Sequence, residues 1–249
     1  MKKNLGQIFL VDKNIAQLEV KQADIKSDDI VLEIGPGTGI LTKFLAEKAK
    51  RVIAIEIDKK LINNLRKILP ENVDLINGDV LKIDFKTLPK FNKIVSNLPF
   101  YISSLFTFKF LDYDFEIAIL IYQKEFAERL VASPGSKNYS RLSVSLYYKA
   151  TGKIIRTIPK TCFKPQPKVD SSMIKIIPRK SPPFNVINEK FFYNLTKNLF
   201  NYRRKKIRKI LNTLYRLDLT KVPYLENRVE ELSPKQIGNL SDIIFKMLN

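Results

Sequence analysis

The chain has 249 residues, enough for one large domain or for one domain with a small appendage. It has 44 Lys and Arg against 25 Asp and Glu, a formal net charge of +19 that favours a polyanionic partner, nucleic acid before an anionic membrane surface. It has no His and one Cys, Cys162, which excludes His-dependent triads, His-ligated zinc, thiolate metal clusters and intrachain disulfides, so we expect no metal site.

No apolar run has the length that spans a membrane, and the first residues lack the apolar core of a signal peptide. We therefore expect a cytoplasmic protein without a membrane partner. Cys162 is expected to be a packed residue and not a nucleophile, because no His is present to activate its thiol.

The first two thirds of the chain alternate apolar runs with segments of helical periodicity. Asp12 is a suitable N-cap for a first helix over residues 13–23. The strands predicted after it are residues 30–34, 52–56, 73–76, 93–96 and 117–122. A helix is predicted after the glycines that follow the first strand, with Leu41, Phe44, Leu45 and Ala49 at helical spacing. Further helices are predicted over residues 59–69, 103–110 and 124–131. This alternation predicts an α/β fold with a mostly parallel sheet, and two last strands, residues 153–158 and 173–177, are expected to pair at its edge.

The composition changes at residues 178–183, where two adjacent prolines are typical of a linker. Beyond that point, residues 189–217 and 233–248 have helical periodicity. We therefore predict a sheet-containing domain over residues 1–180 and a helical domain over residues 181–249.

The glycine loop, Gly35-Pro36-Gly37-Thr38-Gly39, lies between a predicted strand and a predicted helix, and Glu56 ends the next strand. Glycines let a backbone approach a nucleotide, and a carboxylate about 20 residues further on can accept from ribose hydroxyls. A tight turn with a surface Glu is the alternative. The NAD fingerprint needs a glycine three positions after the second, which is missing here. A cofactor without a pyrophosphate, S-adenosylmethionine, therefore fits better, with Asp79 after the third strand as acceptor for its adenine amine.

The tetrapeptide Asn97-Leu98-Pro99-Phe100 follows the fourth of these strands. It is either a turn with an ordinary buried Phe or a holder for a planar amine. In the second interpretation, the Asn97 side-chain oxygen and the Leu98 carbonyl accept the hydrogens of the amine and free its lone pair. Pro99 stiffens the turn, and Phe100 stacks on the ring that carries the amine; for a nucleobase such stacking is worth about 1–3 kcal/mol. In-line attack on a methyl group then needs alignment and no strong base, in keeping with a chain that lacks His.

These motifs, in this order, resemble those of class I S-adenosylmethionine-dependent methyltransferases. More narrowly, the chain resembles the rRNA adenine N6,N6-dimethyltransferases of the KsgA type, in their archaeal and eukaryotic branch, which are relatives of the Erm methyltransferases. Further matching segments are Leu5-Gly6-Gln7-x-Phe9-Leu10, Gln123-Lys124-Glu125, Tyr139-x-Arg141-Leu142-Ser143-Val144 and Phe163-x-Pro165-x-Pro167-Lys168-Val169. The resemblance covers nearly the whole chain and implies a Rossmann-like fold, with a mostly parallel seven-stranded sheet and a small helical C-terminal domain.

The resemblance implies a function as well. It is methyl transfer from S-adenosylmethionine to N6 of adjacent adenosines near the 3′ end of small-subunit rRNA, within a pre-ribosomal small subunit and coupled to its biogenesis. The alternatives are an Erm-type enzyme acting on large-subunit rRNA, or a non-catalytic ribosome-assembly or nucleic-acid-binding factor on the same fold. A NAD-dependent oxidoreductase lacks support from the glycine spacing. We expect a monomer.

The resemblance also assigns residues to the cofactor. They are Ile8, Leu10, Gly35, Gly37, Glu56, Ile57, Asp79, Val80 and Asn97. Ile8 stands where bacterial members usually have Asn or His, so a side-chain hydrogen bond from that position is lost. Ser140 stands where Gly is usual before Arg141.

The target base must be unpaired or flipped out to reach such a site. Tyr101 and Phe163 are further candidates for its pocket, although Phe163 could equally be a buried loop residue. The densest basic run, residues 202–209, is expected on a helix with no acid nearby, which favours phosphate contact over a solvated helix face. From it we assign to RNA Arg203, Arg204, Lys205 and Arg208. The surface around the active-site mouth is expected to be extended by Lys2, Lys3, Arg141 and Lys168.

Overall fold

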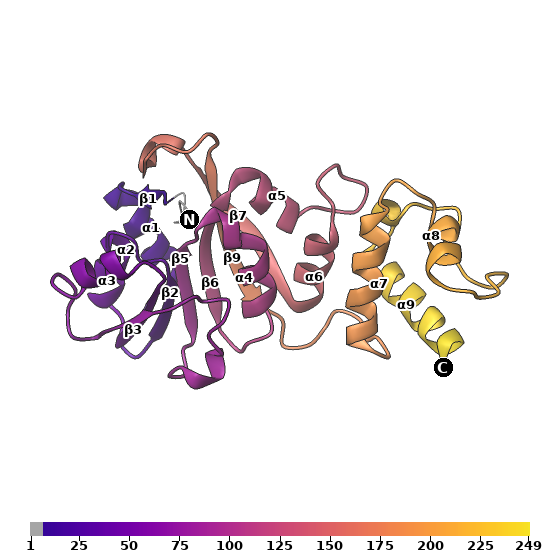
Figure 1. The fold of residues 1–249 in the computed structure, drawn as a ribbon, viewed down its shortest axis with the longest axis horizontal. Helices are drawn as coiled ribbons and strands as arrows, with labels where there is room; N and C mark the ends of the chain where they lie inside the picture. Colours follow the sequence, from indigo (N-terminus) through magenta and orange to yellow (C-terminus); the bar gives the residue numbers. More distant parts are fainter. Residues whose placement is uncertain (1–6) are drawn as a thin grey trace. The chain divides into compact units, whose positions relative to one another are not determined.

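The computed structural model describes residues 7–249 and divides into two compact units (Figure 1). Unit 1 consists of the residues up to Ala127 together with Gly152–Pro178. Unit 2 consists of Glu128–Thr151 together with Arg179–Asn249. The helical region expected from residue 181 thus belongs to a unit that also takes in a second, earlier segment of chain. The expectations for Lys2, Lys3, Leu5 and Gly6 fall outside the described residues.

Unit 1 contains a sheet whose strands are arranged in the order β4-β3-β2-β5-β6-β9-β7. Their bounds are β2 (Ile30–Ile34), β3 (Arg51–Glu56), β4 (Val73–Asn77), β5 (Lys93–Asn97), β6 (Ile117–Gln123), β7 (Ala150–Ile158) and β9 (Ser171–Pro178). The first five strands along the order pair in parallel, and β9 pairs antiparallel with β6. The predicted mostly parallel α/β sheet is therefore confirmed, with β9 and β7 at one edge.

Helices cover the sheet of unit 1. They are α1 (Lys13–Ala23), α2 (Ile40–Ala46), α3 (Lys59–Leu65), α4 (Ser103–Phe110) and α5 (Lys124–Leu130). Asp12 caps α1 as predicted, since its side chain accepts from the backbone N–H groups of Asn14 and Ile15. The helix predicted over residues 59–69 ends at Leu65, because the chain tightens there to i→i+3 hydrogen bonds such as the one from Ile68 N to Leu65 O.

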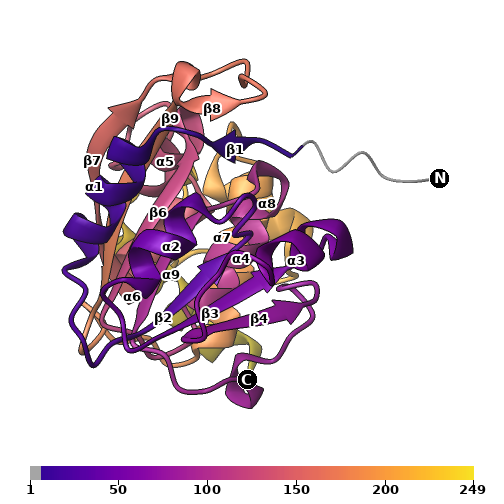
Figure 2. The same cartoon turned by 90° about the vertical axis from the view of Figure 1, so that its left-hand side faces the viewer.

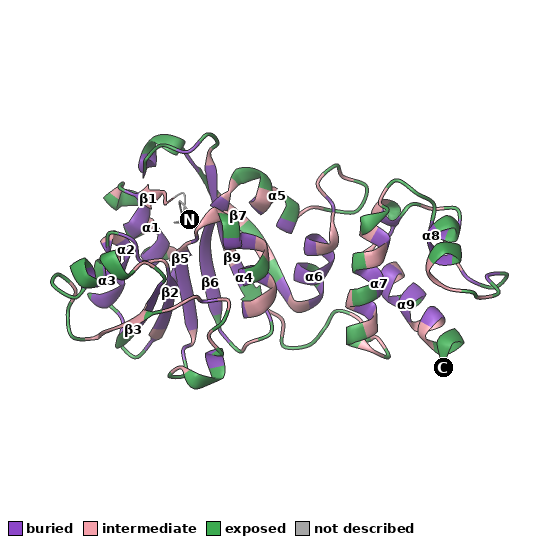
Figure 3. Cartoon of the chain, viewed as in Figure 1, coloured by how far each residue is buried: buried purple, intermediate pink, exposed green. Residues whose placement is uncertain are grey.

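The two faces of the sheet bury different side chains. Figure 2 shows α1 and α2 in front of the strands, where they share a core of aliphatic side chains with β2, β3, β5 and β6. On α4, Thr107 hydrogen-bonds Tyr122 of β6 at 2.7 Å, and Phe106 packs against the short helix η1 (Phe85–Thr87). Strands β5 and β6 are almost wholly buried (Figure 3), which explains the continuous apolar run of β6, whereas in β5 the polar Lys93 and Ser96 are buried as well.

One short two-stranded ladder was not predicted from the sequence. Strand β1 (Phe9–Leu10) pairs antiparallel with β8 (Phe163–Lys164), just after the short helix η3 (Lys160–Cys162). Two-residue strands carry no detectable period, and their partners lie about 150 residues apart, so local pattern could not reveal them. Cys162 is buried, as expected of a packed residue.

Unit 2 is helical in the described residues. Its elements are α6 (Arg141–Lys149), α7 (Glu189–Asn201), α8 (Ile207–Leu214), η4 (Val229–Glu231) and α9 (Pro234–Leu248). Their apolar faces form one core that includes Tyr148, Phe192 and Ile244. The expectation of continuous helix over residues 189–217 was wrong, because residues 202–205 turn, with Lys205 N donating to Tyr202 O at 2.7 Å, Lys206 forms a β-bridge with Arg228, and α8 ends at Leu214. None of the described helices has the length and apolar character needed to cross a membrane.

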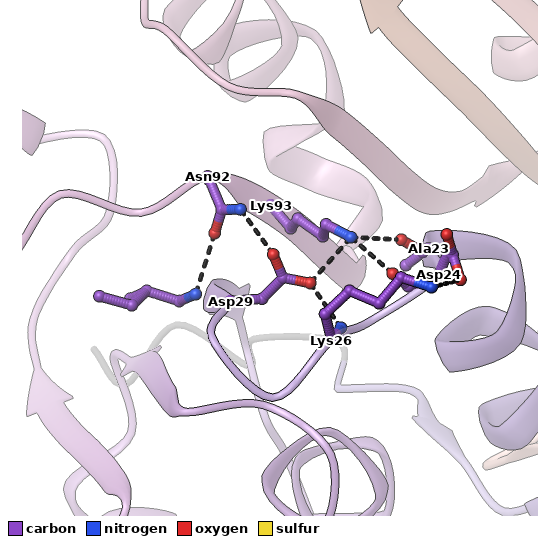
Figure 4. Close-up of polar contacts among 7 residues, drawn as sticks. Ala23, Asp24, Lys26, Asp29, Asn92 and Lys93 are labelled. Atoms are coloured by element: carbon purple, nitrogen blue, oxygen red, sulfur yellow. Dashed lines mark hydrogen bonds and ion pairs between the residues drawn. The ribbon is translucent and has the colours of Figure 1, made fainter.

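A buried polar network ties the amino ends of β2 and β5 to the end of α1 (Figure 4). Lys93 Nζ donates to the carbonyls of Ala23 at 3.1 Å and Asp24 at 2.6 Å, and lies 2.8 Å from Asp29 Oδ2. Asn92 donates to the other Asp29 oxygen at 2.6 Å and accepts from Ile30 N at 2.9 Å. This network lies at the edge of the sheet opposite to the carboxyl ends of the parallel strands.

Candidate active site

Three parallel strands end at one edge of the sheet where the strand order reverses. β2 pairs with β3 on one side and with β5 on the other, so the chain runs outward to β4 and then returns to β5. The loops that follow β2 and β5 turn apart at such a point, and ligands bind in the crevice between them. The predicted glycine loop, Glu56 and the tetrapeptide all lie at this edge.

The backbone of the glycine loop requires glycine. Gly35 and Gly37 have φ angles of +68° and +57°, in the left-handed region where a side chain is strained. A Cβ added to Gly37 would lie 2.7 Å from Cδ1 of Phe9, and one added to Gly35 would lie 3.3 Å from Pro99. The missing side chains therefore let the loop pass close to β1 and to the tetrapeptide.

Glu56 ends β3 with its carboxylate held by the backbone. Oε1 accepts from Asp58 N at 2.9 Å, and Oε2 accepts from Gly37 N at 3.4 Å. Burial raises the pKa of Glu56 above its ordinary value, although both N–H groups favour the ionised form. Because these contacts fix its orientation, the carboxylate is a preorganised acceptor at the pocket.

The tetrapeptide forms the turn from β5 into the short helix η2 (Phe100–Ile102). The Leu98 side chain is 2% exposed and anchors the turn in the core, whereas Asn97, Pro99 and Phe100 are half-buried at the pocket. Ile102 N donates to the Pro99 carbonyl at 3.1 Å, which stabilises the turn. An amide, a backbone carbonyl and a ring thus lie at the end of one strand, as the sequence predicted.

Tyr101 lies at the mouth of the pocket with 58% of its surface exposed. Burial of part of the ring raises the pKa of its phenol, and the carboxylates of Asp79 and Glu56 raise it further. The phenol therefore lies in the electric field of both acids that the sequence assigned to the cofactor.

These side chains line a hollow of about 550 Å³, a volume that includes space open to solvent. Its lining residues are Gln7, Ile8, Phe9, Gly35, Gly37, Glu56, Ile57, Leu61, Asn97, Leu98, Pro99, Phe100 and Tyr101. Among these described residues none is Lys or Arg, and one is an acid. A pocket of this composition suits a ligand that is cationic or neutral better than one that carries phosphates.

Some predicted site residues lie elsewhere. Asp79 and Val80 are in the loop after β4, where Asp79 is half-buried and Val80 is 5% exposed. Leu10 and Phe163 are each 3% exposed, pair with each other in the β1–β8 ladder and pack in the core. The structure therefore does not bring the Phe163 ring into the pocket, and its surroundings match the buried residue that was the alternative.

Three lining residues were not assigned from the sequence: Gln7, Phe9 and Leu61. Gln7 Nε2 donates to Asp58 Oδ2 at 3.0 Å, which joins the segment before β1 to the N-cap of α3. Gln7 and Phe9 belong to the segment of residues 5–10 that matches a family motif, so this motif could have indicated them. Leu61 lies in the first turn of α3, shortly after Glu56. Once Glu56 is assigned to the site, a side chain at this position is expected to face the pocket.

The basic run differs most from expectation, because acids distant in the sequence pair with it. Arg203 pairs with Glu230 at 2.5 Å and donates to the carbonyls of Ser136 and Lys137. Glu226 pairs with both Lys206 and Arg208 at 2.9 Å. The predicted absence of nearby acids was therefore wrong, and Arg203 holds a loop of its own unit.

The remaining predicted RNA contacts are distributed over both units. Arg204 and Lys205 are exposed, and Lys205 Nζ lies 4.8 Å from the centre of the Tyr202 ring. Arg141 begins α6 in unit 2, and Lys168 is exposed in the loop before β9 in unit 1. The described residues contain no cluster of three or more His, Cys, Asp or Glu side chains placed to hold a metal ion.

Comparison with known proteins decides the family. A family model described as "Ribosomal RNA adenine dimethylase" matches residues 1–246. The chain belongs to this family. The dimethylase resemblance found in the sequence is thereby confirmed, and the oxidoreductase alternative is excluded.

Relatives and solved structures agree over almost the whole chain. The chain is 44% identical to a probable ribosomal RNA small subunit methyltransferase A of Methanococcus aeolicus, covering 99% of this chain and 97% of the relative. A protein of the same description from Pyrococcus furiosus is 41% identical, covering 96% and 90%. The dimethyladenosine transferase of Plasmodium falciparum superposes with a TM-score of 0.82 at 31% identity, covering 96% and 97%.

The 23S rRNA methyltransferase ErmE is a more distant structural neighbour. It superposes with a TM-score of 0.72 at 26% identity, covering 97% of this chain and 100% of that one. Dimethylases and Erm methyltransferases therefore share this fold, as the sequence predicted, so the fold does not by itself choose between their substrates.

Proposed function

We propose that this protein transfers methyl groups from S-adenosylmethionine to N6 of adenosines in small-subunit rRNA, dimethylating adjacent adenosines near the 3′ end. The observation that carries the proposal is that the glycine loop, Glu56 and the tetrapeptide line one pocket in a member of the rRNA adenine dimethylase family. The proposed partner is the rRNA of a pre-ribosomal small subunit, and the proposed location is the cytoplasm.

Residues in the pocket and next to it fit S-adenosylmethionine. Glu56, in the pocket lining, offers a fixed acceptor for ribose hydroxyls. Asp79, in the loop after β4 and close enough to Tyr101 to act on its phenol, is the proposed acceptor for the adenine amine. Ile57 and Tyr101 provide apolar surface for a purine ring. The absence of Lys and Arg among the described lining residues suits a phosphate-free molecule with a cationic sulfonium. When bound, S-adenosylmethionine supplies an electrophilic methyl group.

The tetrapeptide prepares the adenine for attack. Asn97 Oδ1 and the Leu98 carbonyl accept the two amine hydrogens, which draws the lone pair out of conjugation with the ring. Phe100 stacks on the flipped base, and the fixed φ of Pro99, −56°, holds the two acceptors in place. Most of the rate enhancement then comes from alignment of the amine with the methyl group, and the proton leaves after transfer without a dedicated base.

The relatives favour the small subunit over the large one. The two archaeal relatives at 41% and 44% identity are described as small subunit methyltransferases, whereas ErmE is 26% identical. We therefore place the substrate in the small subunit, with large-subunit rRNA as the competing outcome of the test.

The test is methyl transfer from labelled S-adenosylmethionine to undermethylated small subunits, with mass spectrometry of the product nucleosides. We expect N6,N6-dimethyladenosine in small-subunit rRNA. Asn97→Ala should lower the rate by about 100-fold, because it removes an acceptor that acts mainly in the transition state. Asn64→Ala, an exposed Asn on α3, is the matched control and should leave the rate unchanged.

Two outcomes contradict the proposal. Methylation of large-subunit rRNA alone would make the protein an Erm-type enzyme. Tight binding of small subunits without any product would make it a non-catalytic assembly factor.

A further inference from the structure

Lys109 connects α4 to the loop that carries Asp79. Its ammonium donates to the carbonyl of Leu81 at 3.1 Å and to that of Ile83 at 2.5 Å. It also lies 4.8 Å from the centre of the Phe85 ring. Two carbonyls and a ring face account for the three N–H donors of an ammonium, so this Lys is fully engaged by one loop.

The same loop is built around Asp79. Leu81 N donates to Asp79 Oδ1 at 3.0 Å, and Lys82 N and Ile83 N donate to the Asp79 carbonyl at 2.9 and 3.2 Å. The turn that orients the Asp79 carboxylate is therefore the same turn whose carbonyls accept hydrogen bonds from Lys109. Movement of those carbonyls would move Asp79.

The helix that carries Lys109 follows directly from the tetrapeptide. Helix η2 begins at Phe100 and passes into α4 at Ser103, and Lys109 lies near the carboxyl end of α4. Phe85 is 3% exposed and packs edge-on against Phe106, one turn before Lys109. One rigid element thus bears the predicted base-binding residue at its start and the anchor of the Asp79 loop at its end.

Lys109 is half-buried, and two acids lie close enough to its ammonium to affect its pKa. Burial lowers the pKa of its ammonium, while Asp84 and Asp79 act in the opposite direction. A group of this kind stabilises a turn by holding carbonyl dipoles together, which an apolar side chain of equal length cannot do.

We propose that Lys109 is a positioning residue for the methyl donor: it holds the loop of residues 79–83 so that Asp79 accepts from the adenine amine, and it joins that loop to the element that carries the tetrapeptide. This inference rests on the proposed function. It predicts that loss of Lys109 lowers the affinity for the adenine group of the methyl donor more than it changes the KM for RNA.

The test compares binding of S-adenosylhomocysteine with that of S-inosylhomocysteine, in which a carbonyl replaces the adenine amine, by titration calorimetry. Lys109→Met should weaken binding of the adenosyl compound by about tenfold and that of the inosyl compound by less than about twofold. The KM for RNA should stay within about twofold of wild type. Lys90→Met, an exposed Lys between η1 and β5, is the matched control and should change neither compound's affinity.

A double-mutant cycle shows whether Lys109 acts through Asp79. In an Asp79→Asn background, Lys109→Met should cause little further loss, because the group it positions is already removed. Lys109→Arg, which keeps a cation with several donors, should retain most of the preference for the adenosyl compound. If Lys109→Met does not fold, the same ratio measured on Lys109→Gln decides the question, with the same expected direction.

The two proposals fail in different ways. A wild-type protein that binds neither compound would refute the proposed function. A wild-type protein that prefers the adenosyl compound, together with a Lys109 variant that keeps this preference or loses affinity for both compounds equally, would refute the role of Lys109 alone.

Discussion

At the scale of single residues, two acids are buried close enough to interact electrostatically, and one of them directly precedes the strand end that leads into the glycine loop. Glu33, in β2, is 2% exposed, and Glu19, in α1, is fully buried. Among the described residues, both carboxylate oxygens of Glu19 and Oε2 of Glu33 have no hydrogen-bond partner. Burial raises the pKa of Glu33 to about 8, and Glu56 adds to this effect. Burial also raises the pKa of Glu19, with Glu33 contributing. With a pKa of about 8, the Glu33 carboxyl holds its proton in the folded protein at neutral pH.

These acids make folding stability depend on pH. Between the ordinary Glu pKa of 4.5 and about 8, the folded protein keeps the proton of Glu33 while the unfolded chain releases it. Stability therefore falls as pH rises through this window, by up to about 1.4 kcal/mol per pH unit for one group. We expect Glu33→Gln to flatten this dependence in urea unfolding at pH 6.0, 7.0 and 8.5. An unchanged slope would show that Glu33 is ionised in the folded state, and the exposed Glu47→Gln should behave as wild type.

At the scale of elements, Lys93 links three segments that are distant in sequence. Its ammonium meets the last carbonyls of α1 and the carboxylate of Asp29, which precedes β2, while Lys93 itself begins β5. The side chains of Lys93 and Asp29 are 7% and 6% exposed, so water screens this pair little. The network holds together the amino ends of β2 and β5, at the edge of the sheet opposite to the pocket.

Removing one partner of this pair should be costly. Lys93→Met leaves Asp29 buried without its cation, and we expect it to lower the free energy of unfolding by about 3–5 kcal/mol. Lys93→Met combined with Asp29→Asn should recover part of that loss, because no buried charge remains. Urea unfolding measures both effects, and S-adenosylhomocysteine affinity of the folded variant should stay at the wild-type value. An equal loss in the single and double variants would mean that packing, not charge, makes the contribution.

At the scale of the whole molecule, the net charge of +19 predicts strongly salt-dependent binding of RNA. Ion pairing divides the basic run, since Glu226 and Glu230 pair with Arg203, Lys206 and Arg208. Arg204 and Lys205 are exposed and form no ion pair with an acid of the described residues. These two residues are therefore the better candidates for phosphate contact.

Charge removal from the two units should have unequal effects. Arg204→Ala with Lys205→Ala should weaken RNA binding and reduce the slope of log affinity against log salt by roughly 1.5, at 0.7–0.9 for each lost phosphate contact. Lys50→Ala with Lys67→Ala removes the same charge from exposed positions of unit 1 and serves as the control. Equal slopes for the two double variants would place the RNA contact of Arg204 and Lys205 in doubt.

The candidate site was largely predictable because most of its residues belong to short sequence motifs. Parallel strands bring their carboxyl ends to one edge, so the glycine loop, Glu56 and the tetrapeptide were expected to meet once the alternation of strands and helices was recognised. Phe163 was misplaced because its burial depends on a two-residue ladder with β1. Lys109 gave no local signal, since its partners are carbonyls 26 and 28 residues away.

By itself the sequence determined the α/β class, the Asp12 cap, the strands of the mostly parallel sheet and the family resemblance, because apolar period, capping residues and motif spacing are local properties. Tertiary structure alone decided that Glu128–Thr151 joins the helical unit, that a break at residues 202–206 separates α7 from α8, and that acids neutralise part of the basic run. It also decided which polar groups are buried. These features depend on contacts between residues far apart in the chain, and burial and electrostatic pairing act through space and leave no periodic trace in the sequence.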